Sequence, residues 1–463
     1  MKGVALMRSA WQRFALLALG FISALSMVPS CQEHGMVPWK RVSGHPGRIL
    51  ESFNQPVQLR PYPYPYHAML AIASDADHQT LRKFNQIHQF LNTYDMTPYG
   101  RGLGLDIADS FFIYNGSNIQ RNIDVGGVPL HQQLAYFYGL SLKPYAASAI
   151  RHYLSCGWID SLHSYGDFST VTEKGTRFHR LLAVKAVQRM LSDGVQVPVW
   201  IDHGNMANVD NFGSRHLRPF FYYQMGAVPQ SPYYHLDVTR KLGIRYMWTD
   251  IDSTSFGLKK VMKPVHMPDG SILYGFSRYT HEKIGSRGEV LWQWTAGDLD
   301  DELSLVHLRK LVREGKSVVV AQHLAANQEF LCLPKNAVQA LQTLAHWQDD
   351  GKILVARTSR LLTYERVHSQ LHYHLLQRGR WLEIHIDPLY DPVFGKHWPS
   401  LSELRGITFY TPHPMHTSIF VGSTRIPDGQ LVVSPSDGHA PSIGIRWFTP
   451  HVQNEAVVLP KVL

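Results

Sequence analysis

The chain has 463 residues, of which 44% are hydrophobic and only 17% are charged. At about 100–200 residues per domain, this length predicts one large domain with a smaller one, and the apolar fraction excludes global disorder. The net charge of +9 is not gathered in a Lys/Arg run, which argues against a nucleic-acid partner. Aromatic residues make up 11% and there are 26 histidines, a composition that favours carbohydrate or metal chemistry.

The first 31 residues are typical of an export signal. Phe14–Leu25 is an apolar run that is short for a membrane span. It follows three basic residues, Lys2, Arg8 and Arg13. The segment that ends at Cys31 is similar to a bacterial lipobox apart from Pro29. The alternatives are a lipoprotein anchored through Cys31, a cleaved signal and an uncleaved apolar anchor. We therefore expect an exported protein, in the periplasm or at the cell surface.

The chain has three cysteines. Besides Cys31, Cys156 and Cys332 lie in segments typical of a core, so we expect them to be buried free thiols. No CxxC or Cys/His zinc-finger spacing occurs, and a thiolate metal site is therefore not expected.

From His67 onward, after an irregular segment over 32–65, strand-length apolar runs alternate with longer amphipathic segments. The expected strands are Ala68–Ser74, Ser110–Tyr114, Trp158–Leu162, Val197–Asp202, Tyr246–Thr249, Leu291–Trp294, Val318–Gln322 and Ile353–Ala356. The expected helices are Thr80–Leu91, Pro144–Leu154, Arg177–Ser192, Tyr234–Leu242, Leu303–Glu314 and Asn336–Gln348. This alternation predicts an α/β fold, a (β/α)7–8 barrel over residues 66–365. GxGxxG and P-loop motifs are absent, which removes the usual support for nucleotide binding.

Residues 366–463 differ from the preceding segment in their pattern. Short alternating runs, such as "WLEIHI" and "SIGIRWF", are separated by Pro, Gly, Asp and Ser. This pattern predicts an antiparallel β module that resembles a sandwich. Its two alternative roles are packing on the barrel and binding glycan, and we favour packing.

Two acidic residues, Asp75 and Asp77, follow the first expected strand. Residues i and i+2 of a strand point to the same side, so these side chains can converge at the strand end, where barrels have their active sites. Two close carboxylates repel unless a cation or proton lies between them. In the alternative interpretation, one Asp caps the helix expected over Thr80–Leu91.

His163 and Asp167 follow the third expected strand and are four residues apart. They share a face if the loop turns into a helix. An imidazole together with carboxylates suits a divalent transition metal such as zinc. The alternative is that both residues lie in a surface loop without a ligand.

Later strand ends are also rich in polar and aromatic side chains. We expect five of these residues to contact a sugar: His203, Asn205, Asn208, His235 and Trp248. His203 is also a candidate metal ligand. His323 follows a late strand, where a histidine can protonate a leaving group.

These residues resemble the motifs of the polysaccharide deacetylase (NodB-homology) superfamily of carbohydrate esterases. The resemblance implies a barrel that removes acetyl groups with a divalent metal, with Asp75 as general base, Asp77 as metal ligand and His323 as general acid. The segment from His163 to Asp167 resembles the second motif and implies two further ligands there. The chain departs from the family where Ala76 separates the two Asp residues and where Asp167 replaces a histidine. The strings "SDAD", "LHSYGDF" and "WIDHGN" are similar to a divergent branch linked to bacterial surface polysaccharides.

We therefore expect a metal-dependent, deacetylase-like hydrolase that acts on an exported polysaccharide or oligosaccharide. One alternative is a metal-free glycoside hydrolase that uses Asp75 with Asp250 or Asp252. The other is a glycan-binding protein without catalysis on a decayed deacetylase barrel.

Overall fold

The computed structural model describes residues 48–49, 57–116, 129–168, 175–203, 208–213, 224–248, 252–284, 286, 288, 290–327 and 331–458. The expected export signal and Cys31 lie outside these residues. None of the described helices is long and apolar enough to cross a membrane. Cys156 and Cys332 are buried free thiols, as expected.

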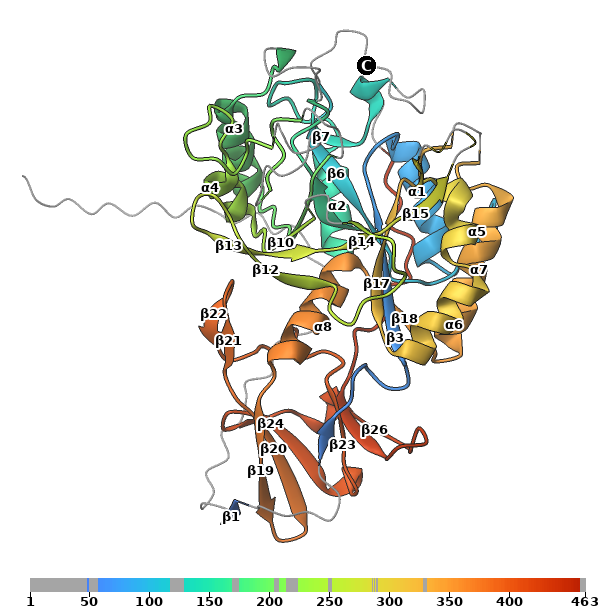
Figure 1. Ribbon diagram of the computed structural model, residues 1–463, viewed down its shortest axis with the longest axis vertical. Helices are drawn as coiled ribbons and strands as arrows, with labels where there is room; N and C mark the ends of the chain where they lie inside the picture. Colours follow the sequence, from blue (N-terminus) through green and yellow to red (C-terminus); the bar gives the residue numbers. More distant parts are fainter. Residues whose placement is uncertain are drawn as a thin grey trace, which may run out of the picture. The chain divides into compact units, whose positions relative to one another are not determined.

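A twelve-stranded sheet dominates the larger part of the molecule (Figure 1). Its strands are β3 (Ala68–Ser74), β6 (Ala108–Tyr114), β7 (Ala135–Phe137), β8 (Ile159–His163), β9 (Val199–Ile201), β10 (Tyr246–Trp248), β11 (Asp252–Ser253), β12 (Met262–His266), β13 (Ile272–Phe276), β14 (Arg278–Tyr279), β17 (Ser317–Gln322) and β18 (Ile353–Val355). The main path runs β11-β14-β17-β3-β6-β8-β9-β10-β13-β12. Every pair on it is parallel except β12 with β13. All seven residues of β3 are buried, which is typical of a parallel strand that is covered on both faces.

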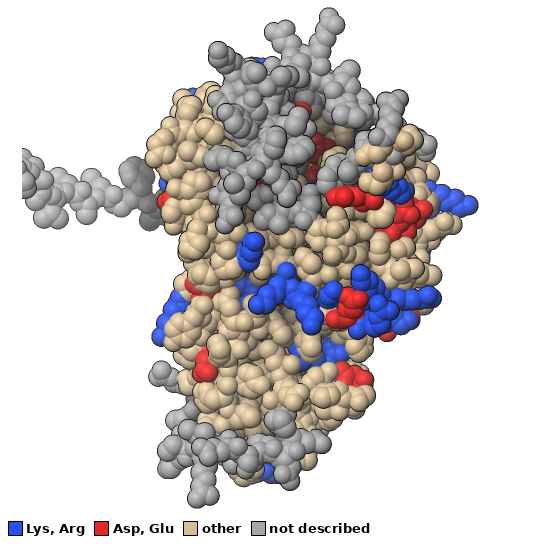
Figure 2. Space-filling model, in the orientation of Figure 1, with Lys and Arg blue, Asp and Glu red and all other residues tan. Residues whose placement is uncertain are grey.

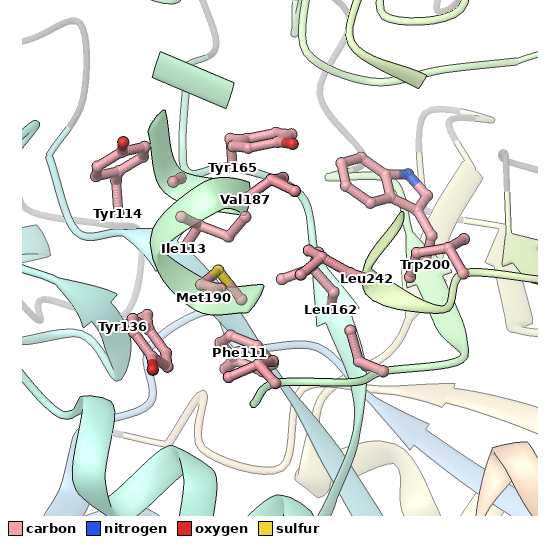
Figure 3. Packing of buried hydrophobic residues seen from close by; sticks show 14 of the residues in the cluster. Phe111, Ile113, Tyr114, Tyr136, Leu162, Tyr165, Val187, Met190, Trp200 and Leu242 are labelled. Carbon is pink, nitrogen blue, oxygen red and sulfur yellow. The ribbon is translucent and has the colours of Figure 1, made fainter. Parts of the chain in front are cut away.

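Helices alternate with these strands and cover the sheet. They are α1 (Leu81–Asn92), α2 (Ala147–Cys156), α3 (Arg180–Ser192), α4 (Leu236–Thr239), α5 (Leu299–Glu302), α6 (Leu305–Glu314), α7 (Lys335–Asp349) and α8 (Thr358–Gln370). α1 begins after Thr80, whose side chain accepts a hydrogen bond from the backbone N–H of Lys83, an N-cap that satisfies a free donor. Figure 3 shows how Val187 and Met190 of α3 pack near Phe111 and Leu162 of the sheet.

The expected α/β class is confirmed, but a closed (β/α)7–8 barrel is not. Among the described strands, no pairing joins the β11 end of the path to the β12 end. The expected barrel strand over Leu291–Trp294 is instead β16 (Val290–Gln293), antiparallel to β15 (His281–Ile284). Leu291 is 44% and Trp294 43% exposed. The apolar run therefore lies in a hairpin at the surface, and the strand that belongs to the sheet is β13, which the sequence analysis missed.

The C-terminal module contains two main sheets. The first has the order β1 (Arg48–Ile49), β19 (Tyr373–Arg378), β20 (Trp381–Ile386), β24 (Thr417–Val421) and β25 (Thr424–Arg425). The second has the order β2 (Gln58–Leu59), β23 (Thr408–Tyr410), β27 (Ser442–Ile445) and β26 (Leu431–Ser434). Among the described strands, three two-stranded hairpins are separate from these sheets: the hairpin of β15 and β16, the hairpin of β4 (Met96–Thr97) and β5 (Gly100–Arg101) after α1, and, in the module, that of β21 (Leu389–Asp391) and β22 (Gly395–His397).

The module departs from the expected antiparallel pattern in one pair, because β20 and β24 are parallel. A period of two residues places side chains on alternate faces and carries no information on strand direction. The segment over 32–65 was expected to be irregular, but it supplies edge strands β1 and β2 to the two sheets.

The module shares a hydrophobic core with the large sheet. One buried cluster contains Met69 of β3 and Val319 of β17 together with Ile384, Phe409 and Ile419 of the module. Such a cluster couples the stability of the two regions, since each loses buried apolar area without the other.

Polar contacts also join the two regions. Arg366 of α8 donates to Asp391 Oδ2 at 2.8 Å and to Glu403 Oε1 at 2.5 Å. The expected boundary between residues 365 and 366 thus falls inside α8. Near the C-terminus, the carbonyl of Val457 accepts a hydrogen bond from Asn85 Nδ2 of α1 at 2.8 Å.

Candidate metal centre

Asp75 and Asp77 lie at the C-terminal end of β3, beside the end of β17. The backbone N–H of Asp75 donates to the carbonyl of Gln322 at 2.8 Å, so Asp75 continues the pairing of the two strands. The Asp75 side chain is 4% exposed and that of Asp77 is 15% exposed. Asp77 is therefore the more accessible of the two carboxylates, and Asp75 is the more deeply buried.

Backbone strain is concentrated at this point. Among the described residues other than glycine, positive φ occurs at His78 (62°) and Ser164 (54°). They directly follow Asp77 and His163. Such conformations cost free energy, and proteins retain them mainly where a functional geometry requires them.

Asp77 lies between two histidines from neighbouring strand ends. His163 Nε2 is 2.9 Å from Asp77 Oδ2, and His203 Nε2 is 2.9 Å from Asp77 Oδ1. The intervening strand β6 supplies Phe112, whose ring centroid lies 4.9 Å from that of His163 and 5.6 Å from that of His203. The two imidazoles are thus packed against an apolar ring and directed at one carboxylate.

Ligand atoms of three side chains lie within 4.8 Å of one another in two groups among the described residues. One consists of Asp77, His163 and His203, and the other of Asp75, Asp77 and His323. The first offers two imidazole nitrogens and one carboxylate oxygen, which is a donor set that divalent transition metals accept. In the second, Asp75 is already engaged by an arginine, as described below, so the first group fits a metal better.

His203 is fixed through its backbone by Asn211. The N–H of His203 donates to Asn211 Oδ1 at 3.0 Å, and Asn211 Nδ2 donates to the carbonyl of His203 at 2.6 Å. Asn208 Nδ2 lies 3.3 Å from the same Asn211 oxygen. Asn208 is 1% exposed, so its position fits support of this turn, and the expected contact with a sugar does not fit. Sequence reasoning missed Asn211 as a positioning residue.

Asp167, the expected third ligand, lies on the far side of His203. Its Oδ1 is 3.8 Å from His203 Nδ1, the ring nitrogen that faces away from Asp77. It belongs to neither of the two ligand groups. His203 therefore takes the place that the sequence analysis gave to Asp167. A carboxylate near the second nitrogen of a ligating histidine is suited to orienting the ring.

Asp75 is held by Arg278, which the sequence analysis did not single out. Arg278 Nη1 lies 2.5 Å from Asp75 Oδ1, and Nη2 lies 3.1 Å from Oδ2. The guanidinium stacks on Trp248 at 3.6 Å from the ring centroid. Trp248 is 4% exposed, so its ring supports Arg278, and the expected contact with a sugar does not fit its burial. The signal for Arg278 was its place two residues after the end of the missed strand β13, where β14 begins.

His323 completes the site from the end of β17. Its Nε2 is 3.4 Å from Asp77 Oδ2 and 3.7 Å from Asp75 Oδ2. Its backbone N–H donates to the carbonyl of Trp294 at 2.7 Å, and the two ring centroids are 5.7 Å apart. Trp294, the residue after β16, thus connects the hairpin of β15 and β16 to His323.

The charges of the site keep its acidic groups ionised. Burial raises the pKa of Asp75, but Arg278, with His163 and His323, holds it below the ordinary value. Burial likewise opposes ionisation of Asp77, and the adjacent histidines bring its pKa well below the ordinary value. Conversely, burial disfavours the charged form of His203 and His323, yet the carboxylates raise the pKa of His203 to about 10 and also raise that of His323.

Other predicted residues do not meet at this site. His235 is fully buried, with Nδ1 2.8 Å from Thr239 Oγ1 and Nε2 2.7 Å from the carbonyl of Asp210. Burial lowers its pKa to about 4. Its position fits a core residue, and the expected contact with a sugar does not fit. Asn205 and Asp250 lie outside the described residues, as does the side chain of Asp252.

The geometry therefore brings together Asp75, Asp77, His163 and His323 as the sequence predicted. It replaces Asp167 with His203, and it adds Arg278 and Asn211. A comparison of the chain with protein-family models, curated proteins and solved structures finds no match.

Proposed function

We propose that the protein is a metal-dependent, deacetylase-like hydrolase that acts on an exported or cell-surface polysaccharide. The observation that carries this proposal is the placement of one carboxylate between two histidines, with a second carboxylate and a third histidine beside it. Export, expected from residues 1–31, agrees with such a substrate.

The arrangement of strands supports the finer fold that this proposal requires. β13 and β14 are separated only by Ser277 and can be taken as two halves of one strand. The sheet then has seven parallel strands in the order β17, β3, β6, β8, β9, β10 and the combined β13 and β14. β13 pairs with β10 and β14 pairs with β17. We therefore propose a distorted seven-stranded barrel that is interrupted at Ser277.

In this proposal Asp77, His163 and His203 would hold the metal ion, and zinc would suit their donor atoms. A bound divalent ion supplies Lewis-acid polarisation of an acetyl carbonyl and acidifies water. Phe112 excludes solvent from one side of the histidines, and Asn211 fixes the backbone of His203.

Asp75 and His323 carry the proton transfers. Asp75, kept ionised by Arg278, takes a proton from the attacking water as the water oxygen bonds to the acetyl carbon. The bond from that carbon to the sugar nitrogen or oxygen then breaks, and protonated His323 gives its proton to the departing amine or hydroxyl. The lowered pKa of Asp75 suits a base, and the raised pKa of His323 suits an acid.

The test combines metal analysis with acetate release from N- and O-acetylated oligosaccharides. Asp75→Asn should abolish turnover and leave the metal bound, because a base is lost and no ligand is lost. Asp77→Asn, His163→Ala and His203→Ala should lower both metal content and turnover. Exposed His346 provides the control, since His346→Ala removes a histidine remote from the site.

Equal loss of metal in Asp75→Asn and in the ligand variants would show that the base and ligand roles are wrongly divided. Sugar binding without acetate release, by a protein that retains its metal, would favour the glycan-binding alternative. Cleavage of glycosidic bonds that persists without metal would favour a glycoside hydrolase.

A further inference from the structure

Six basic side chains gather at the end of β17 opposite the metal centre. This basic patch consists of Lys259, Lys260, Lys263, Lys310, Arg313 and Lys316. The first three belong to the segment that enters β12, and the others come from α6 and the turn before β17. Figure 2 shows Lys and Arg side chains gathered across the middle of the face seen in Figure 1.

Backbone pairing brings the two segments together. Leu258 and Ser317 form an antiparallel bridge, with N–H to carbonyl distances of 2.8 and 3.1 Å. In that register Lys259 stands opposite Lys316. Phe256 also stacks on His307 of α6, with ring centroids 4.7 Å apart. The segment over 256–260 therefore lies along α6, whose last turn carries Arg313.

The patch has little negative charge to balance it. Glu314 pairs with Lys316 at 2.7 Å and lies 3.5 Å from Arg313. Within the described part of the chain, no ion pair joins Lys259, Lys260 or Lys263 to a carboxylate. Like charges that face each other across a strand pair are destabilising. Glu314 offsets the charge of Lys316, whereas Lys259, Lys260 and Lys263 keep positive charge that a bound anion would balance.

The composition of the patch favours a hydrated polyanion over a lipid surface. Residues 256–263 and 309–317 contain no exposed large hydrophobic side chain, and all of these residues are described. The exposed Leu305 and Val306 begin α6, at the end of the helix away from Arg313 and Lys316. Segments that dock on membranes combine cations with apolar side chains that enter the interface. A soluble polymer with carboxylate or phosphate groups needs only the cations.

We propose that the basic patch binds an anionic polysaccharide, and thus that the substrate polymer carries acidic groups. This inference rests on the proposed polysaccharide substrate. β17 runs from Ser317 at the patch to Gln322, next to His323. Six residues of strand span about 20 Å, so a polymer held at the patch remains within reach of the metal centre.

The test measures binding of the full chain to polygalacturonate, with dextran as the neutral polymer. The double variant Lys259→Glu and Lys260→Glu should bind polygalacturonate about tenfold more weakly at low salt, with a shallower dependence on salt. The control variant Lys185→Glu and Lys396→Glu makes the same change of charge at exposed positions on α3 and β22, and should bind as the wild type does. Lys259→Gln with Lys260→Gln serves as a milder pair if the first variant folds poorly.

Equal affinity of the patch and control variants would overturn the proposal. It would also be overturned if phosphatidylglycerol vesicles or duplex DNA bound through these lysines and polygalacturonate did not. Binding is measured without turnover, and release of acetate from short neutral oligosaccharides should be the same in all these variants. Failure of the proposed reaction would therefore appear in the wild type, separately from failure of the patch.

Discussion

The candidate metal centre and the junction with the C-terminal module both contain a buried arginine. Arg278 pairs with Asp75 at 2.5 Å and stacks on Trp248. At the junction, Arg366 pairs with Asp391 at 2.8 Å and stacks on an aromatic ring at 4.0 Å. The two regions therefore use the same local chemistry to bury a cation.

They differ in how completely the nitrogens of the two arginines are satisfied. Arg366 has two carboxylate partners and also donates to Tyr246 Oη at 3.1 Å. At the metal centre, Arg278 Nε, His163 Nδ1 and His323 Nδ1 are buried without a hydrogen-bond partner in the described structure. Orphaned buried polar atoms cost free energy. The comparison shows that the nitrogens of Arg366 are all satisfied within the fold and that Arg278 keeps one nitrogen without a partner among the described residues.

The largest expected effect tests the junction as a whole. A chain that ends at Glu365 cuts α8 and removes the module's share of the common core. We expect it to lose its cooperative thermal transition, because buried apolar area contributes about 25 cal/mol per Å². Melting and pull-down with a polysaccharide decide the outcome. An unchanged melting temperature with lost pull-down would show that the module is an independent glycan-binding unit.

Arg366→Ala tests the same region with one side chain. The change leaves Asp391, which is fully buried, without its cation. Breaking a buried ion pair in this way costs about 3–5 kcal/mol, which denaturant unfolding would measure. Exposed Arg380 gives the control variant, Arg380→Ala, with an expected change below about 0.5 kcal/mol. A similarly small change in Arg366→Ala would contradict the role of the junction.

Arg278→Lys tests the arginine of the candidate metal centre in the same way. Lysine keeps the charge but cannot form the paired contacts with Asp75. We expect turnover to fall by about 100-fold through misplacement of the base, while metal content stays near that of the wild type. Loss of the metal with unchanged turnover per bound ion would show that Arg278 supports the ligands and not Asp75.

The smallest effect concerns Glu365, beside Arg366 in α8. Ser317 Oγ donates to its carboxylate, and burial raises the pKa of Glu365 to about 7. Because the folded state holds the proton more tightly than the unfolded state, stability is full below about pH 4.5 and falls as the pH rises to about 7. Glu365→Gln should therefore be more stable than the wild type at pH 8, with about 3 kcal/mol as the upper bound that this shift of the pKa sets, and with no difference at pH 4. A difference that is independent of pH would exclude this cause.

Much of the candidate metal centre could be predicted from the sequence, because its residues lie at or directly after the ends of strands. Asp75, Asp77, His163 and His323 lie at the ends of β3, β8 and β17, and parallel strand ends meet at one edge. Asp167 was preferred over His203 because spacing on the second motif was the available guide. The choice depends on which ring nitrogen faces Asp77, and spacing carries no information on that.

Amino-acid order alone determined the strand–helix alternation, the β-rich C-terminal region and the acidic end of the first strand, since these follow from local periodicity. Tertiary structure decided the pairing of Arg278 with Asp75, across more than 200 residues of chain. Tertiary structure also decided the basic patch, because a bridge between Leu258 and Ser317 brings its lysines together. No long run of Lys and Arg in the sequence predicts this patch. The physical reason is the same in both cases: electrostatic contacts depend on distance in space, and backbone pairing sets that distance independently of separation in the sequence.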